Sequence, residues 1–247
     1  DFQLCIKWYG INVMHLEKDS MKLLPCYLLF FASSDAFISN SWCKRQQVVL
    51  ASSLPSIEEL ENDPFMKQVQ HGTHLSSALQ EDPTNSDIHE SIKAQLGSSD
   101  GIRGFMVSYL TSEDTSPEAL TVPDGLAEVL REKTRSNPKD LVPLAFMNVI
   151  MPTAMSTMHN EEELRKSSAK TAKRGLSVLA TMAGEHPSVK SNAEAILDVA
   201  VGNKREDGDS TPIEYWTSFF DKWGYKDEQK KDISESMSIF LSSNYDK

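Results

Sequence analysis

The chain has 247 residues, with 25 Lys or Arg and 36 Asp or Glu, so its formal net charge is −11. Eleven Gly and eleven Pro are ordinary numbers for this length, which excludes collagen-like and low-complexity proteins. The length is sufficient for one or two domains with a buried core. The acidic balance argues against duplex nucleic acid as the main partner, because phosphate binding requires clustered cations.

The first part of the chain has the pattern of a targeting segment. The first residue is Asp, and we expect residues 1–20 to lie upstream of a start at Met21, with Met14 as the other candidate. Lys22 then precedes nine mostly apolar residues, and small residues occupy the −3 and −1 positions of a cleavage site. This pattern predicts a secretory signal peptide over 21–36, with a buried helix as the alternative. The apolar run is shorter than the roughly 20 residues that a membrane-spanning helix needs.

The next stretch, 37–55, has the composition of a transit peptide. It is rich in Ser and contains Lys44 and Arg45, and the next acidic residue is Glu58. Basic, Ser-rich and acid-poor sequence is typical of segments that direct import into an organelle. We therefore expect 37–55 to be disordered and the folded domain to occupy 56–247.

The junction between the two segments carries a specific resemblance. A signal peptide that ends at Ala36-Phe37 and continues into a transit-like stretch resembles the bipartite plastid-targeting presequence of diatom-like algae, whose motif is Ala-Phe-x-Pro or close to it. This chain has Ser39 where Pro is common. The resemblance covers residues 21–53 and implies delivery to a plastid, without implying any activity. The stroma is favoured over the thylakoid lumen because a lumenal protein would need a second apolar segment, and plain secretion is the alternative destination.

The cysteines fit an intracellular destination. All three, Cys5, Cys26 and Cys43, lie in the part that we expect to be removed. The mature chain would then contain no disulfide, no Cys-based metal site and no catalytic thiol.

The remainder of the chain predicts one all-α domain. Helical spacing and cap residues recur along it, and no alternating β-branched runs are found. We expect about eight helices, in an orthogonal or bundle-like arrangement around one buried helix. The surrounding helices are expected over about 64–79, 88–96, 100–110, 126–130, 161–184 and 187–200, from 211 onward, and over 227–243, and the buried helix is expected over 139–159. Asp63-Pro64 and Thr211-Pro212 are predicted starts, with Asp63 and Thr211 as N-caps and each Pro first in its helix.

The helix at 139–159 is apolar on every side, which is typical of a buried helix. Pro143 and Pro152 lie inside it, and we expect a kink at Pro152. The segment is too short and too broken for a membrane span, so no transmembrane helix is predicted in the mature chain.

No motif for catalysis, metal binding or cofactor binding is found. His71 and His74 are spaced i, i+3, without the i, i+4 spacing and the Glu of a zinc-protease helix. No histidine of the mature chain follows a Glu by three residues, which excludes a carboxylate-bridged di-iron bundle. Nucleophile-elbow, phosphate-loop and dinucleotide motifs are absent. We therefore predict no catalytic residue, no metal and no cofactor, and leave enzymatic activity open, with a leaning against it.

Two groups of residues are candidates for binding a partner. Five cations fall within ten residues of one predicted helix, four of them on one face, and could bind an anion or an acidic partner: Arg165, Lys166, Lys170, Lys173 and Arg174. Aromatic residues crowd another helix and could form an interface if exposed: Trp216, Phe219, Phe220 and Trp223. The alternatives are a solvated, ion-paired face for the cations and core packing for the aromatics.

These observations favour a non-enzymatic plastid protein. The leading hypothesis is a binding, assembly or regulatory module for a photosynthetic complex, with a protein partner and an undetermined oligomeric state. The first alternative is a helical ligand-binding protein or enzyme with a pocket near Asn148 and His159. The second is an extrinsic lumenal subunit of a photosystem.

Overall fold

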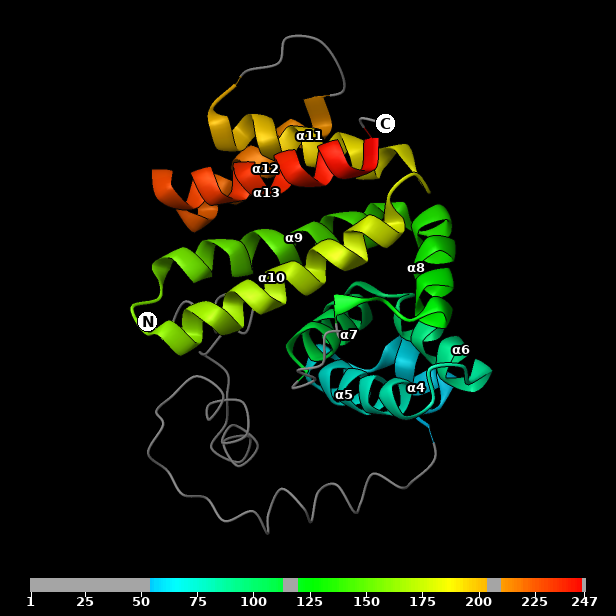
Figure 1. The fold of residues 1–247 in the computed structure, drawn as a ribbon. Helices are drawn as coiled ribbons and strands as arrows, with labels where there is room; N and C mark the ends of the chain where they lie inside the picture. The colour runs from blue at the N-terminus through cyan, green and yellow to red at the C-terminus, as the bar shows by residue number, and fades with distance from the viewer. Residues whose placement is uncertain (1–53, 113–119, 204–209, 246–247) are drawn as a thin grey trace. The chain divides into compact units, whose positions relative to one another are not determined.

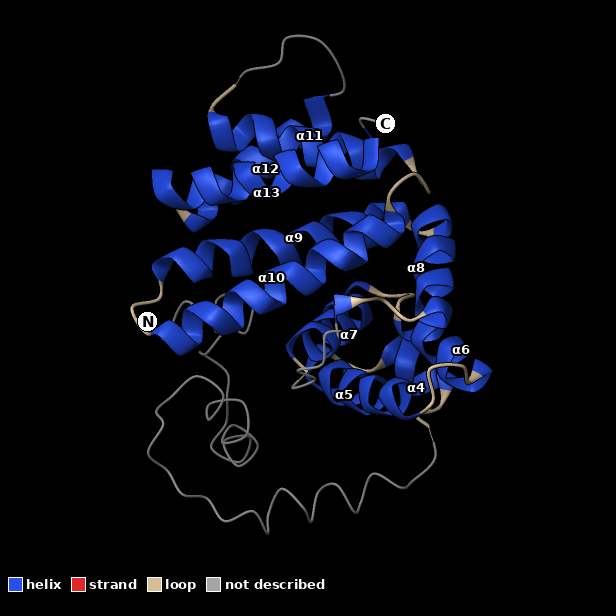
Figure 2. Cartoon of the chain, viewed as in Figure 1, coloured by secondary structure: helices blue, strands red, loops and turns tan. Residues whose placement is uncertain are grey.

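The computed structural model describes residues 54–112, 120–203 and 210–245. All of them belong to one compact unit, Ser52–Lys247. The described residues form ten helices and contain no strand (Figures 1 and 2): α4 (Ile57–Asn62), α5 (Phe65–Glu81), α6 (Ser86–Gln95), α7 (Ser99–Thr111), α8 (Asp124–Ser136), α9 (Pro138–Met158), α10 (Glu162–Met182), α11 (Pro187–Val201), α12 (Ser210–Trp223) and α13 (Asp227–Tyr245). The predicted all-α class is confirmed. The predicted signal and transit segments lie outside the described residues, apart from the last two positions of 37–55.

Helix α9 is central to the packing of this unit. It runs beside α10 (Figure 1) and also contacts α7, α8, α11 and α13. Leu141, Phe146 and Ile150 on this helix are fully buried. By length and composition alone α9 could cross a membrane, but 61% of its apolar window is buried inside the protein. The apolar composition of α9 therefore reflects neighbours on several sides, as the sequence predicted.

Helices α5 and α7 cross very closely. Gly72 and Gly104 lie at the crossing, where a Cβ on Gly104 would meet the backbone of Gln68 at 2.5 Å. Beside them, the Ser108 hydroxyl on α7 donates to the Val69 carbonyl on α5 at 2.9 Å. Small residues allow this approach because nothing larger than hydrogen stands between the backbones.

The first helix of the unit was not predicted from the sequence. Ser56 caps α4, and a reciprocal capping box joins it to Glu59. This Ser-x-x-Glu pattern is a recognisable sequence signal for a helix start. Asp63 is consequently the C-cap of α4 rather than the N-cap of α5, and Pro64 takes the N-cap position without a side-chain bond.

The start of α12 also differs from the prediction. Its described part begins at Ser210, so Thr211 and Pro212 lie inside the helix instead of at its N-cap and first position. Pro212 is tolerated there because N–H groups in the first turn of a helix have no partner within that helix. The expected kink at Pro152 stays a prediction.

Candidate binding surface

The predicted cationic stripe is partly neutralised within its own helix. Arg165 forms an ion pair with Glu162, and Lys166 lies 3.8 Å from Glu162 and 3.4 Å from Glu163. These carboxylates occupy the first turn of α10, where the helix dipole also favours negative charge. The exposed end of the stripe is therefore a mixed-charge surface rather than a positive one.

Arg174 does not belong to an exposed stripe at all. Its side chain is 3% exposed, its Nη1 donates to the Ser112 carbonyl at 2.9 Å, and its guanidinium lies 5.2 Å from the centre of the Tyr109 ring. Arg174 thus ties α10 to the end of α7. Lys170 is half-buried and Lys173 is exposed, so the structure does not bring all five predicted cations into one patch.

The aromatic group belongs to the core instead of the surface. Trp216 is fully buried, and Phe219 and Phe220 are nearly so. The Trp216 ring packs edge-on against Phe146 of α9, with 6.4 Å between ring centroids, and its indole nitrogen donates to Asn192 Oδ1 at 2.8 Å. Trp216 thus attaches α12 to α9 and α11, and the burial of all three rings means that they do not form an open interface. Trp223 is half-buried beside them.

The two residues of the alternative pocket hypothesis have different surroundings. Asn148 is 8% exposed and donates to the Leu144 carbonyl at 2.8 Å, one turn earlier in its own helix. His159 caps the end of α9. Its Nε2 is buried without a partner among the described residues, and burial lowers the pKa of the imidazole. Neither residue lines either of the two hollows described below.

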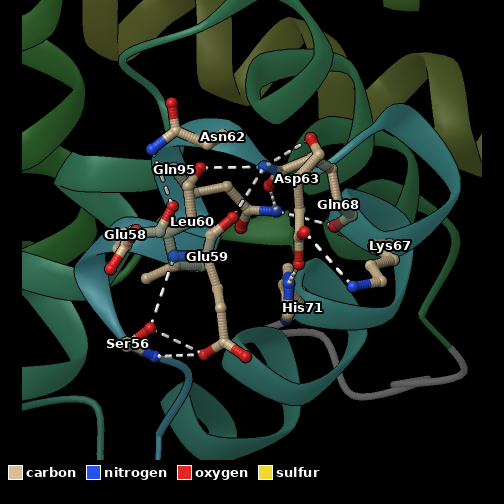
Figure 3. A network of polar contacts seen from close by, with 10 residues as sticks. All are labelled: Ser56, Glu58, Glu59, Leu60, Asn62, Asp63, Lys67, Gln68, His71 and Gln95. Carbon is tan, nitrogen blue, oxygen red and sulfur yellow. Dashed lines mark hydrogen bonds and ion pairs between the residues drawn. The ribbon is translucent and has the colours of Figure 1, made fainter.

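A buried amide network holds the N-terminal helix in place (Figure 3). Gln68 Nε2 donates to the carbonyls of Leu60 at 2.8 Å and Asp63 at 3.1 Å. These carbonyls lie at the C-terminal end of α4, where the helix itself supplies no donors. Gln95 in turn donates from Nε2 to the Gln68 carbonyl at 2.6 Å and to Gln68 Oε1 at 3.1 Å. Both glutamines are 0% exposed, so the network is structural.

Gln68→Met is expected to destabilise the protein by about 1–3 kcal/mol, because the carbonyls of Leu60 and Asp63 lose their donor and the Gln95 amide loses one of its two acceptors. Gln70→Met is the matched control, since Gln70 lies on the same helix and is exposed. Urea unfolding of the two variants, followed by far-UV circular dichroism, measures the difference. Equal stabilities would show that the amide network contributes nothing.

An Asp–His pair lies at the edge of this network. His71 Nε2 is 2.9 Å from Asp63 Oδ2, and Lys67 Nζ is 3.3 Å from Asp63 Oδ1 (Figure 3). The hydrogen bond from His71 lowers the pKa of Asp63 most, and Lys67 lowers it further against the effect of desolvation. The lowered pKa means that the ionised Asp63 stabilises the folded state. This stabilisation is fully present above the ordinary Asp pKa of 3.8, and it is lost as the pH falls through the lower pKa that Asp63 has in the folded protein.

Asp63→Asn is therefore expected to flatten the acid side of the stability curve. The wild type should lose stability more steeply than the variant below about pH 4, because only the wild type must protonate a stabilised carboxylate. Midpoints of urea unfolding between pH 2.5 and 6 provide the comparison. Glu61→Gln, at an exposed carboxylate of α4, controls for the change in net charge. Parallel curves for the wild type and Asp63→Asn would contradict this account.

An open groove follows the seam between α11 and α13. Two hollows lie along it: one of about 240 Å³, lined by Ala200, Val201, Asp227, Lys230, Lys231 and Ser234, and one of about 280 Å³, lined by Lys190, Glu194, Leu197, Ser238, Leu241 and Tyr245. Both are open to solvent, and Val201 is 50% exposed. We call these two hollows together the α11–α13 groove. Sequence reasoning missed it because helical spacing does not show that Leu197 and Leu241 are only partly covered.

Metal ligands are not clustered in the described part of the chain. No group of three or more His, Cys, Asp or Glu side chains lies close enough there to hold a metal ion. His71 pairs with Asp63, His89 Nε2 lies 2.9 Å from the Pro83 carbonyl, and His186 caps α11. Each of these histidines therefore has a partner within the fold.

Comparison with known families finds one match. The model of the family described as "Uncharacterised conserved protein UCP020893" matches residues 65–240. This span begins at the first residue of α5 and ends in α13, and it includes most of the α11–α13 groove. Searches of the curated proteins and of the solved structures found no match. Since the matched span covers well over half of the chain, this protein belongs to the UCP020893 family of uncharacterised conserved proteins.

Proposed function

We propose that this protein is a non-enzymatic module that is delivered to a plastid and binds a partner protein there, in the binding, assembly or regulation of a photosynthetic complex. The resemblance of residues 21–53 to a bipartite presequence supports the destination. The stroma is the favoured compartment because the presequence has one apolar segment that fits a signal peptide and no convincing second one.

The binding role is supported by one observation, the α11–α13 groove. Three side chains elsewhere that could have carried binding hold helices together instead: Arg174, Trp216 and Gln68. In the groove, Val201 is half exposed, and Leu197 and Leu241 are only partly covered. Hydrophobic grooves between helices commonly accept a helix of a partner protein.

The proposal is tested by purifying the tagged full-length protein from its native cell. The mature N-terminus is sequenced, and co-purifying proteins are quantified by mass spectrometry. We expect a start between about 37 and 56, and photosynthetic subunits attached. A start at 21, with no processing beyond it, would contradict the plastid destination.

A pair of matched variants tests the groove in the same purification. Val201→Glu with Ser238→Glu places two charges in the groove at exposed positions. Ile239→Glu with Ser243→Glu places the same charges at exposed positions of α13 outside it. We expect the first pair to lose the partner and the second to retain it. Equal recovery with both pairs would contradict binding through the groove.

A further inference from the structure

We infer that the occupant of the α11–α13 groove is an amphipathic helix of a partner protein that carries acidic residues at the end facing Lys230 and Lys231. The inference rests on the proposed binding function and goes beyond it by specifying the partner's shape, polarity and charge. Spacing, apolar exposure and charge distribution along the groove support it in turn.

The spacing of the lining residues fits a helical occupant. On α11 the lining positions include 190, 194, 197 and 201, and on α13 they include 227, 230, 234, 238, 241 and 245. Steps of three and four residues place each set along one side of its helix. Lys190 lies over the Tyr245 ring at 5.6 Å, while Val201 lines the same hollow as Asp227, so the two helices run in opposite directions. A third helix can lie along such a seam, as in a helical bundle.

The lining of the groove as a whole sets the length of the contact. Leu197 and Leu241 line one hollow, and Val201, 50% exposed, lines the other. The lining positions from 190 to 201 span about 16 Å of α11, at 1.5 Å per residue. A partner helix of about three turns would cover this distance, with apolar residues at i, i+3 or i+4, and i+7.

The two ends of the groove differ in charge. At one end the cation is already paired, because Lys190 Nζ lies 3.8 Å from Glu194 Oε1. At the other end Lys230 and Lys231 form no ion pair with any described residue. Asp227 lines the same hollow, so its lining carries two cations and one carboxylate, close to the N-terminus of α13, where the helix dipole adds positive potential. A partner carboxylate would be favoured at this end only, and it would therefore fix the direction of the bound helix.

The test uses a displayed library of 18-residue helical peptides and the full-length protein. The library has Leu, Ile, Met or Phe at positions spaced i, i+3, i+7 and i+11, and any residue elsewhere. Peptides that bind the wild-type protein but not the Val201→Glu, Ser238→Glu variant are selected and sequenced. We expect Asp or Glu to be enriched at one end of the kept peptides and to be ordinary at the other.

Charge reversal then tests the pairing directly. Affinities are measured by fluorescence anisotropy for the Lys230→Glu, Lys231→Glu variant and for Lys139→Glu, Lys173→Glu, which changes the net charge equally at exposed positions on α9 and α10. We expect at least tenfold weaker binding to the first variant only, and recovery when the peptide's acidic end is changed to Lys. Groove-dependent peptides that show no acidic end and no response to Lys230→Glu, Lys231→Glu would overturn this inference but leave the proposed function intact. Recovery of no groove-dependent peptide would count against both.

Discussion

Gly104→Val is expected to cost about 3 kcal/mol or more of the free energy of unfolding, at the upper end of what overpacking produces. A Cβ at this position would lie 2.5 Å from the Gln68 carbonyl carbon and 2.7 Å from the Gln68 Cβ. The backbone of α5 cannot move aside without separating the two helices, because Gly72 on α5 also lies against α7. A Cβ on Gly72 would lie 2.8 Å from the Gly104 carbonyl oxygen. A branched side chain would push α7 away from α5.

The effect is measured by urea unfolding followed by far-UV circular dichroism. Gly202→Asn is the control, because Gly202 has φ +75° and nothing lies within 4 Å of an added Cβ. Asn tolerates this left-handed conformation, so the control should lose less than about 1 kcal/mol. A Gly104→Val protein within 1 kcal/mol of the wild type would show that α5 and α7 cross more loosely than described.

Trp216→Ala is expected to destabilise the protein by about 3–5 kcal/mol, the usual cost of removing a large buried aromatic side chain. The ring is 0% exposed and contacts Phe146 of α9 and Phe219 of its own helix. Its removal would also leave Asn192 Oδ1 without the indole donor. Because the same side chain joins α12 to both α9 and α11, the loss should weaken the support of the α11–α13 groove as well.

Tyr215→Ala is the matched control for this substitution. Tyr215 is the neighbouring aromatic residue and is 41% exposed, so its replacement should cost about 1 kcal/mol or less. Trp216→Phe keeps most of the ring volume and loses the hydrogen bond, which separates the two contributions. Similar losses for Tyr215→Ala and Trp216→Ala would contradict the assignment of Trp216 to the core.

Composition was sufficient to predict that α9 is buried, because a helix that is apolar on every side is stable only where other elements surround it. The cationic stripe on α10 could not be resolved in the same way. Helical spacing places Lys170 and Arg174 one turn apart, but it does not show that Arg174 turns toward Ser112 and Tyr109. The direction of the Arg174 side chain depends on the end of α7 lying beside it, and α7 is more than sixty residues away from Arg174 in the sequence.

Buried polar residues were equally hard to identify from the sequence. Gln68 and Gln70 lie two positions apart on α5, yet one is fully buried and the other is exposed. The difference arises because α4 ends over Gln68 and presents its unpaired carbonyls there. The Ser56–Glu59 capping box that starts α4 was visible in the sequence and would have predicted that neighbour.

The α11–α13 groove is the central claim about function, and site-specific photo-crosslinking tests it most directly. A photoreactive amino acid is placed at Ser238 in the groove or at Ser243, an exposed position of α13 outside it. Each full-length protein is irradiated in an extract of its native cell, and cross-linked peptides are mapped by mass spectrometry. We predict that Ser238 alone cross-links to a helical segment of one partner protein. Cross-linking from Ser243 with the same yield, or from neither position, would contradict a binding role for the groove.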